Sequence, residues 1–125
     1  LRSASADPLP APITRPMVVD FASLDAATIV PGQCTAATGR ASYDYIQAAI
    51  DAALARRIEG VTTGPINKEA LHAAGINFPG HTEIFAARTD AARSCMMQYA
   101  PEITCTFVTV HVGYAEVPRL LTVSR

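Results

Sequence analysis

Val61-Thr62-Thr63-Gly64-Pro65-Ile66-Asn67-Lys68 is the stretch of sequence that decides the fold class. Its first three residues are β-branched and predict a strand, which Gly64-Pro65 ends. A helix of about two turns is predicted next, because Asn67 can cap it and Ile66 can pack against Leu71 as a hydrophobic staple. A strand that leads through a tight turn into a helix is typical of an α/β protein.

The helix before this stretch is predicted over residues 39–57. Its apolar side chains recur at helical spacing, at Tyr43, Ile46, Ile50, Ala53, Leu54 and Ile58. Thr38 is the expected N-cap, and Gly60 fits the left-handed position past the C-terminus. A single apolar stripe predicts that this helix packs against a sheet and takes no part in chemistry.

The elements after the stretch continue the alternation of helices and strands. They are predicted as a helix at residues 83–88, strands at 96–99 and 103–110, and a helix from residue 115. Gly75 is expected to end the short helix that follows Lys68, and Pro118 is tolerated in the first turn of the last helix. The second strand is apolar enough to be buried.

This order predicts an α/β fold for residues 17–125, as an incomplete part of a larger domain. Residues 1–16 contain four prolines and predict an extended segment. Short apolar runs at 17–21 and 28–30 are candidate strands. The chain opens on Leu1 and closes in what reads as an amphipathic helix, so we expect it to be cut from a longer protein or to dock its ends on a partner.

The composition is that of a globular protein. Of 125 residues, 50% are hydrophobic and 17% are charged, and ten basic against eleven acidic residues leave a net charge of −1. This balance gives no attraction to nucleic acids or membranes. No apolar run approaches the ~20 residues of a membrane span, and no signal-peptide pattern opens the chain. We expect a soluble, cytoplasmic protein.

The cysteines are odd in number, Cys34, Cys95 and Cys105, and have no metal-knuckle spacing. This usage predicts free, buried thiols in a reducing compartment rather than disulfides.

Polar clusters follow two of the predicted strands. Residues 62–68 leave the first of them, and His111-Val112-Gly113 leaves the last. In open α/β sheets, ligands bind beyond the carboxyl ends of the strands, so two parallel strands would bring both clusters to one edge. We therefore expect one site.

Two of the three histidines are candidate ligands. His111 can hold a metal ion, act as a general base, or only end a strand at the surface. His81 and Thr82 follow Gly80 at the start of a helix, where they can bind a phosphate or carboxylate or serve only as turn and cap. His72 is expected on a solvent face without function. A catalytic metal usually takes three protein ligands, so this chain falls short of a full set.

Lys68 and Asn67 are the candidate catalytic residues. Lysine can hold a phosphate or protonate an alkoxide, although a lysine in the first turn of a helix is more often only solvated. Neither GxGxxG nor GxxxxGK[ST] occurs in the chain, which argues against an ordinary dinucleotide-binding or P-loop domain.

Two longer motifs in this region resemble a known family. Residues 63–68 (TGPINK) and 75–83 (GINFPGHTE) are similar to the signature of the 4-hydroxythreonine-4-phosphate dehydrogenases. Residues 31–33, 39–43 and 109–111 fit the same pattern with compatible spacing. The resemblance covers less than half of a typical family member, so the chain resembles a central segment of such an enzyme.

The resemblance implies a fold and a reaction. The family has the three-layer α/β sandwich of isocitrate and isopropylmalate dehydrogenases, of which this chain would be a partial domain. Its members are homodimers that act in pyridoxal phosphate biosynthesis. They oxidise the 3-hydroxyl of a phosphorylated hydroxy-acid substrate with NAD and a divalent metal (zinc, cobalt or magnesium), and the resulting β-keto acid loses CO2.

The resemblance also implies roles for particular residues. His81 and Thr82 would hold the substrate, and His111 would be one of three histidine metal ligands. Asn67 and Lys68 match a family motif, and the NAD contacts stay unassigned. The other metal histidines and most of the NAD-contacting segment belong to the family's C-terminal part, and its glycine-rich N-terminal motif is absent here. The segment alone is therefore expected to be inactive.

Other functions stay open. The family usually has Pro-Leu after the metal histidine, whereas this chain has Val112-Gly113-Tyr114. A dehydrogenase of phospho-threonate or phospho-erythronate is therefore an alternative. A non-catalytic fragment or dimerisation module is another, and an acyl-phosphate transferase of the same broad fold, which needs no metal, is a third.

Overall fold

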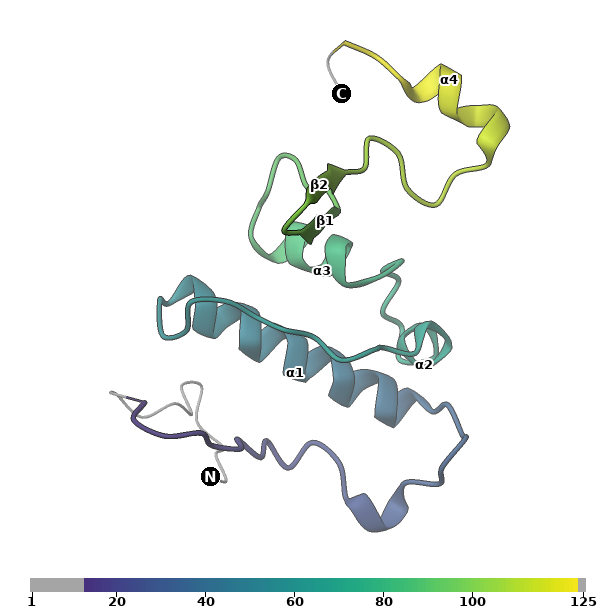
Figure 1. Ribbon diagram of the computed structural model, residues 1–125. Helices are drawn as coiled ribbons and strands as arrows, with labels where there is room; N and C mark the ends of the chain where they lie inside the picture. Colours follow the sequence, from purple (N-terminus) through teal and green to yellow (C-terminus); the bar gives the residue numbers. More distant parts are fainter. Residues whose placement is uncertain (1–12, 124–125) are drawn as a thin grey trace. The chain divides into compact units, whose positions relative to one another are not determined.

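The computed structural model describes residues 13–123 and divides the chain into two compact units, Leu1–Asp90 and Ala91–Arg125. In chain order the elements are the 3-10 helix η1 (Ala26–Thr28), the helices α1 (Ala36–Leu54), α2 (Lys68–Ala73) and α3 (His81–Arg88), the strands β1 (Met97–Ala100) and β2 (Ile103–Thr106), the 3-10 helix η2 (Tyr114–Glu116) and helix α4 (Val117–Leu120). The first unit is helical, and the second contains both strands (Figure 1). Most of the predicted extended segment 1–16 lies outside the described residues.

Helix α1 begins earlier than the sequence predicts. Its N-cap is Thr35, and Thr38 lies inside the helix as the other half of a capping box. Thr35 Oγ1 accepts a hydrogen bond from the Thr38 amide, and Thr38 Oγ1 accepts one from the Thr35 amide, each at 3.2 Å. The expected cap at Thr38 is wrong because Ala36 and Ala37, the best helix formers, extend the helix by one turn.

The C-terminal end of α1 also differs from the prediction. The helix ends at Leu54, and the left-handed residue after it is Arg56 (φ 56°) rather than Gly60. The amide of Arg57 donates to the carbonyl of Ala52 at 2.8 Å. Because this backbone bond already satisfies a terminal carbonyl, the end of the helix does not require the glycine.

The hydrophobic core of the first unit forms where α3 packs against α1. Ile46, Ile50 and Ile84 are buried together. Around them pack the half-buried side chains Tyr43, Ile66, Phe78 and Phe85. At the surface, Arg88 Nη2 and Asp51 Oδ1 join the same two helices at 2.6 Å. The predicted apolar stripe of α1 is confirmed at Tyr43, Ile46 and Ile50, but Leu54 is exposed and Ile58 lies beyond the end of the helix. Within the described residues the stripe faces helices rather than a sheet.

Helix α2 forms as predicted and lies unusually close to α1. The side chain of Asn67 caps it by accepting a hydrogen bond from the Ala70 amide at 2.8 Å, and Gly75 (φ 76°) ends it. A Cβ atom added to Gly39 would lie only 1.9 Å from the carbonyl oxygen of Ala70. The two helices therefore touch backbone to backbone, and Leu71 is fully buried beside this contact.

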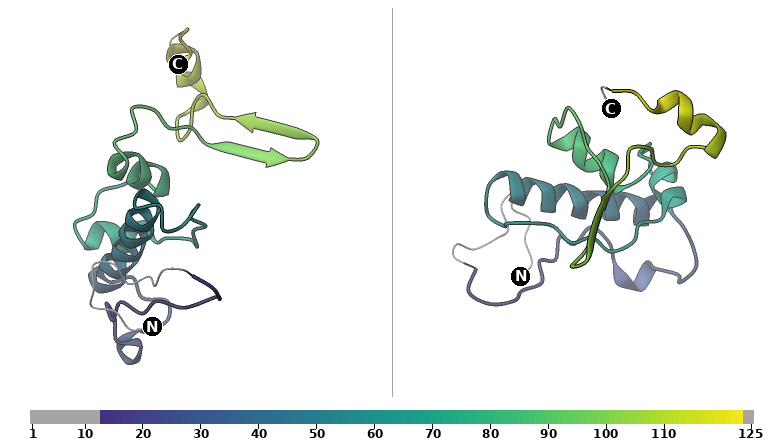
Figure 2. Two further views of the ribbon diagram at one scale, coloured as in Figure 1. Left: turned by 90° about the vertical axis from the view of Figure 1, so that its left-hand side faces the viewer. Right: turned by 45° about the horizontal axis from the view of Figure 1, so that its top comes forward.

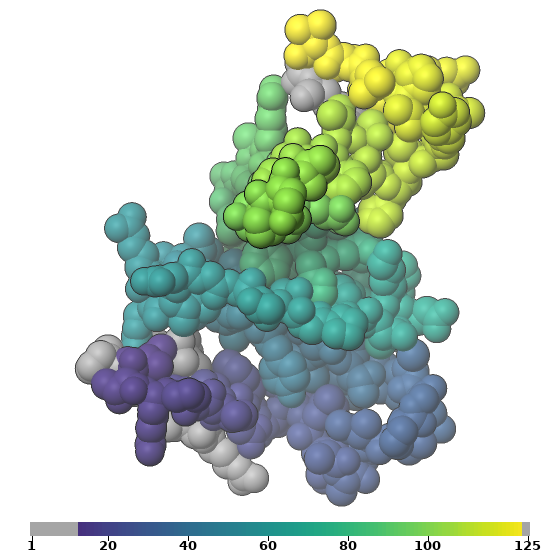
Figure 3. Space-filling view, in the orientation of Figure 1, coloured from purple at the N-terminus to yellow at the C-terminus, as the bar shows by residue number. Residues whose placement is uncertain are grey.

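Residues 61–66 form no strand, contrary to the prediction. After α1 the chain turns back and runs along that helix towards α2 (Figure 1), at the surface of the unit (Figure 3). A strand needs a neighbour for its backbone groups, and no described segment pairs with this one. The predictions of strands at 17–21 and 28–30 are also wrong. Only a single bridge residue, Asp20, remains there, and Thr28 belongs to η1.

The second unit contains an antiparallel hairpin, whose two strands Figure 2 shows side by side. The register pairs Met97 with Thr106, and the predicted turn joins the strands. Strand β2 ends at Thr106 rather than at Val110. The last bond of the ladder runs from the Phe107 amide to the Met96 carbonyl at 3.0 Å, and no described segment continues the pairing beyond it.

The hairpin is not a buried strand pair. None of residues 91–123 is buried, and Phe107, Val108 and Val110 are 38%, 49% and 39% exposed. The prediction of a buried last strand is therefore wrong for the described residues, because no second layer covers either face of the pair.

The remaining predictions have mixed outcomes. The three cysteines are free, as predicted, but exposed rather than buried. Helix α4 has Pro118 in its first turn, as predicted, but it ends at Leu120, so the last described residues are not helical. Within residues 13–123, no helix is long and apolar enough to cross a membrane.

Candidate functional site

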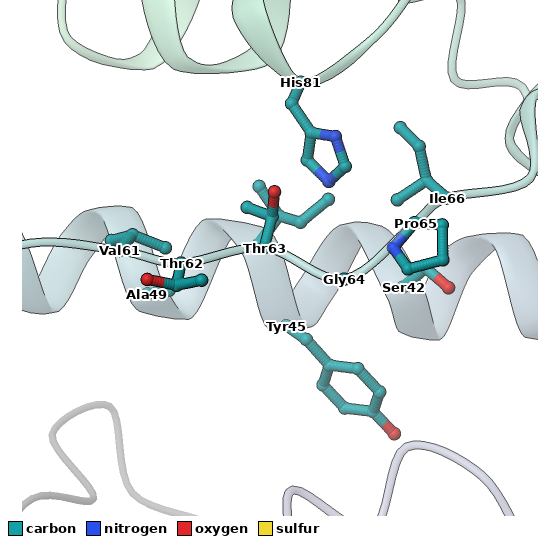
Figure 4. Close-up of a pocket in the computed structure, with 11 residues that line it drawn as sticks. Ser42, Tyr45, Ala49, Val61, Thr62, Thr63, Gly64, Pro65, Ile66 and His81 are labelled. Carbon is teal, nitrogen blue, oxygen red and sulfur yellow. The ribbon is translucent and has the colours of Figure 1, made fainter. Parts of the chain in front are cut away.

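A groove of about 240 Å³ lies between α1 and the extended loop that leads to α2. Its lining residues are Ser42, Tyr45, Ile46 and Ala49 from α1, residues 61–66, and His81. Figure 4 shows the imidazole of His81 reaching from the start of α3 towards the loop. The groove therefore combines a largely apolar wall with a few polar groups, as ligand sites commonly do.

His81 is held in place by the packing of its own helix. It is the first residue of α3 and is half-buried. Three residues further on, Ile84 is 1% exposed and packs against Ile46 and Ile50 of α1. Because this contact fixes the first turn of α3 on α1, the imidazole enters the groove from a rigid support.

The start of α3 has the chemistry of an anion site. Gly80 is its N-cap and provides no side-chain hydrogen bond, so the first amide groups of the helix are free of a capping side chain. The carboxylate of Glu83 lies near this end: its Oε2 is 3.5 Å from the position of a Cβ added to Gly80. Glu83 therefore serves as a first-turn partner of the helix dipole and would compete with an incoming anion.

Thr82 does not lie with His81 in the groove. It is half-buried on the first turn of α3, but it is not among the residues that line the groove. The structure thus separates the two residues that the sequence groups together, and only His81 faces the loop.

Asn67 and Lys68 also lie outside the groove lining. The Asn67 side chain is engaged as the cap of α2, which explains its presence at this position without a catalytic role. Lys68 is exposed at the first residue of that helix. His72 is exposed on α2, as predicted.

His111 belongs to the second unit and is exposed. It lies in the loop after β2 rather than at a strand end, and its backbone adopts a positive φ of 56°. Across residues 13–123, no three His, Cys, Asp or Glu side chains gather closely enough to hold a metal ion. The described part of the chain therefore offers His111 as a single imidazole and no complete metal site.

Sequence reasoning missed the contribution of α1 to the groove. Ser42, Tyr45 and Ala49 are spaced three and four residues apart, so they form a second face beside the apolar stripe. Tyr45 also packs against Phe21, with ring centroids 5.9 Å apart. The signal was present in this spacing, but it could not be told from an ordinary solvent face without knowing that residues 61–66 run along it.

Comparison with known proteins identifies the relatives of this chain. The family model of pyridoxal phosphate biosynthetic protein PdxA matches residues 4–125. The chain is 40% identical over 100 residues to the 4-hydroxythreonine-4-phosphate dehydrogenase of Desulforapulum autotrophicum, which covers 80% of this chain and 29% of that protein. It is 40% identical over 88 residues to the D-threonate 4-phosphate dehydrogenase of Cupriavidus necator, which covers 70% and 26%.

The fold has solved relatives as well. A 4-hydroxythreonine-4-phosphate dehydrogenase from Burkholderia phymatum matches with a TM-score of 0.71 and 37% identity, over 82% of this chain and 31% of that one. The chain thus spans less than a third of the proteins it matches here, and it shares their mixed α/β content. Because the family model covers nearly the whole sequence, as the TGPINK and GHTE motifs predict, the chain belongs to the family of pyridoxal phosphate biosynthetic protein PdxA.

Proposed function

We propose that this chain is the central part of a dehydrogenase that oxidises a phosphorylated hydroxy acid. The observation that carries the proposal is the groove with His81 in it, at a helix start that no side chain caps. The names of the relatives, 4-hydroxythreonine-4-phosphate and D-threonate 4-phosphate dehydrogenases, agree with a substrate that has both a phosphate and a hydroxyl group.

In the proposed enzyme, the start of α3 receives an anionic group of the substrate. Free backbone amides and the His81 imidazole donate hydrogen bonds to its oxygens, and Thr82 supports the same turn. An anion must displace the Glu83 carboxylate from this end of the helix, which favours a ligand with more than one charge. A phosphate meets this requirement.

We assign the metal role to His111. One imidazole is a fitting ligand for zinc or cobalt and less so for magnesium, and the remaining ligands would come from parts of the protein outside this segment. A divalent ion held there would favour deprotonation of the substrate alcohol and stabilise negative charge after loss of CO2. Exposure of His111 leaves its ring accessible for such a bond.

In the proposed reaction, NAD when bound would supply the acceptor for the hydride that leaves C3 of the substrate, while the 3-hydroxyl loses its proton. The β-keto acid that results then releases CO2. Lys68 is the candidate proton donor to the enolate that loss of CO2 leaves; it lies outside the groove lining, so this role rests on the TGPINK motif that it belongs to. The whole protein is proposed to work as a cytoplasmic homodimer with the isocitrate-dehydrogenase-like sandwich fold, to which this chain contributes a part.

The substrate of the proposed enzyme is 4-phosphohydroxythreonine, in pyridoxal phosphate biosynthesis. The alternative is D-threonate 4-phosphate, which is favoured by the likeness to the Cupriavidus necator enzyme and by the Val112-Gly113-Tyr114 sequence after His111. The two compounds differ at the carbon next to the carboxylate, so a direct comparison of their turnover separates them.

The test uses the full-length protein with each substrate, NAD and a divalent metal, and follows NADH formation. His81→Gln is expected to raise KM at least about tenfold, because the flexible glutamine amide replaces a rigid ring donor and weakens the hydrogen bond to a charged group. His111→Ala is expected to abolish metal binding in a calorimetric titration. His72→Ala, an exposed imidazole outside the groove, is the matched control and leaves both values unchanged.

Absence of NADH with both substrates would contradict the proposal and favour the non-catalytic module. An unchanged KM in His81→Gln would show that the groove does not bind the substrate. The 125-residue chain by itself is expected to produce no NADH, because it supplies only part of the ligands that the reaction requires.

A further inference from the structure

The groove contains a second polar group that faces the same side as His81. Thr63 lies on the extended loop opposite the start of α3, and Figure 4 shows its hydroxyl and the His81 imidazole on the same side of that loop. The neighbouring Thr62 points to the other side, as successive residues of an extended chain do. The loop therefore selects one of two adjacent threonines to stand beside the histidine.

The other hydroxyl groups of the groove are engaged or turned away. Ser42 donates its hydroxyl proton to the Thr38 carbonyl at 2.9 Å. Tyr45 points away from His81 in Figure 4, and its ring packs against Phe21. By contrast, neither the Thr63 hydroxyl nor the His81 ring makes a hydrogen bond within the described residues. These two side chains are therefore the groups of the groove that remain available to a ligand.

We propose that Thr63 is a further substrate-binding residue, whose hydroxyl donates a hydrogen bond to the same anionic group of the substrate that His81 holds. The inference rests on the proposed function of the groove. It replaces Thr82, which lies outside the groove lining, with a threonine from a different segment as the hydroxyl partner of the histidine. The phosphate and the carboxylate of the substrate share the oxygen acceptors that this pair recognises.

The two contacts come from supports of different kinds. His81 is carried by α3, which Ile84 anchors in the core, whereas Thr63 is carried by a loop without backbone pairing. Three residues after Thr63, Ile66 packs against the same core cluster and anchors the loop there. The segments that carry His81 and Thr63 therefore pack against the same buried isoleucines. This shared support positions the two side chains relative to each other before a ligand binds.

The experiment uses the full-length protein and three variants. Thr63→Val keeps the shape of the side chain and removes the hydroxyl, and Thr63→Ser keeps the hydroxyl. Thr104→Val is the matched control, since it makes the same change at an exposed threonine outside the groove lining. KM for 4-phosphohydroxythreonine and for D-threonate 4-phosphate is measured, together with competitive inhibition by inorganic phosphate and with thermal unfolding to verify folding.

Thr63→Val is expected to raise KM about tenfold, with Thr63→Ser and Thr104→Val within about twofold of the wild type. If inhibition by inorganic phosphate weakens in parallel, the shared group is the phosphate. If that inhibition is unchanged while KM rises, the group is the carboxylate. Either result supports the contact.

Equal KM values in Thr63→Val and Thr104→Val would overturn the inference. A failure of the proposed function is distinguishable from this, because it would leave His81→Gln without effect as well. Should Thr63→Val unfold, Thr63→Ala with Thr63→Ser as its rescue gives the same comparison.

Discussion

The two units of this chain differ in how they treat their apolar side chains. In the first, Ile50 and Ile84 are each 1% exposed and lie in one cluster. In the second, Tyr99 and Ile103 are 74% and 64% exposed on the hairpin. Length and composition of an element do not decide this difference, since both units contain strongly apolar segments. What decides it is whether another layer of the same chain covers them.

This difference shows that local sequence can determine whether a helix or strand forms, while other segments of the chain determine whether it is buried. The β1–β2 pairing needs only the turn and the ladder between neighbours. The α1–α3 contact needs residues more than thirty positions apart to meet, and its buried members, Ile46, Ile50 and Ile84, all belong to the first unit. A two-stranded hairpin by itself is marginally stable in water, so the first unit carries the stability of this segment.

The largest expected effect tests the difference in burial directly. Ile50→Ala removes a buried side chain and is expected to lower the free energy of unfolding of the 125-residue chain by about 3.5 kcal/mol. Ile103→Ala is the matched change on the hairpin and is expected to cost less than about 0.5 kcal/mol, because the side chain is already solvated. Urea unfolding followed by the helical signal at far-ultraviolet wavelengths measures both. Equal losses of unfolding free energy in the two variants would contradict the difference in burial between the two units.

A slightly smaller effect is expected at the close contact between α1 and α2. Gly39→Ala places a methyl group against the carbonyl of Ala70 and is expected to destabilise the first unit by about 3 kcal/mol. Gly60→Ala is its control, since no atom lies within 4 Å of the added methyl group. The free energy of unfolding of Gly60→Ala is expected to equal or slightly exceed that of the wild type in the same urea experiment. A stable Gly39→Ala chain would mean that the helices can separate.

The cap of α2 provides an intermediate test that also concerns function. Asn67→Ala is expected to cost about 1 kcal/mol, whereas Asn67→Asp keeps an acceptor for the Ala70 amide and is expected to cost little. In the full-length protein, turnover by Asn67→Asp is expected to equal that of the wild type. A large fall in turnover at unchanged stability would instead make Asn67 a catalytic residue.

The smallest effect is expected from the ion pair between Arg88 and Asp51. Both side chains are nearly half exposed, at 46% and 48%, so solvent screens their attraction. A double-mutant cycle with Arg88→Met and Asp51→Asn is expected to give a coupling of about 0.5 kcal/mol that vanishes in 1 M salt. A coupling that persists at high salt would show that the pair is a structural part of the α1–α3 contact.

The sequence predicts most of the helices and the family. Asn67 and Gly75 act through contacts a few residues away, so their roles can be read locally. The stripe from Tyr43 to Ile50 is visible from its helical spacing, although its packing partner in α3 is more than thirty residues away. The motifs around Pro65 and His81 are specific enough to indicate the family that the family model matches.

The remaining features depend on contacts that a local pattern does not contain. Residues 61–63 have the composition of a strand, but pairing requires a neighbouring strand, and none lies beside them in the described chain. Thr35 and Thr38 are chemically equivalent caps, so the choice between them rests on the two alanines that follow Thr35. Thr82 follows His81 in sequence, yet the groove takes Thr63 instead, because proximity along the chain does not fix direction in space.

The close approach of Gly39 to Ala70 has a consequence for binding thermodynamics. One wall of the groove is α1, and the other is the loop that runs directly into α2. Since the two helices already touch without room for a methyl group, α2 cannot move further towards α1 at that end. A ligand therefore cannot draw that end of the groove tighter around itself, and its affinity depends on how well its own shape fits the space.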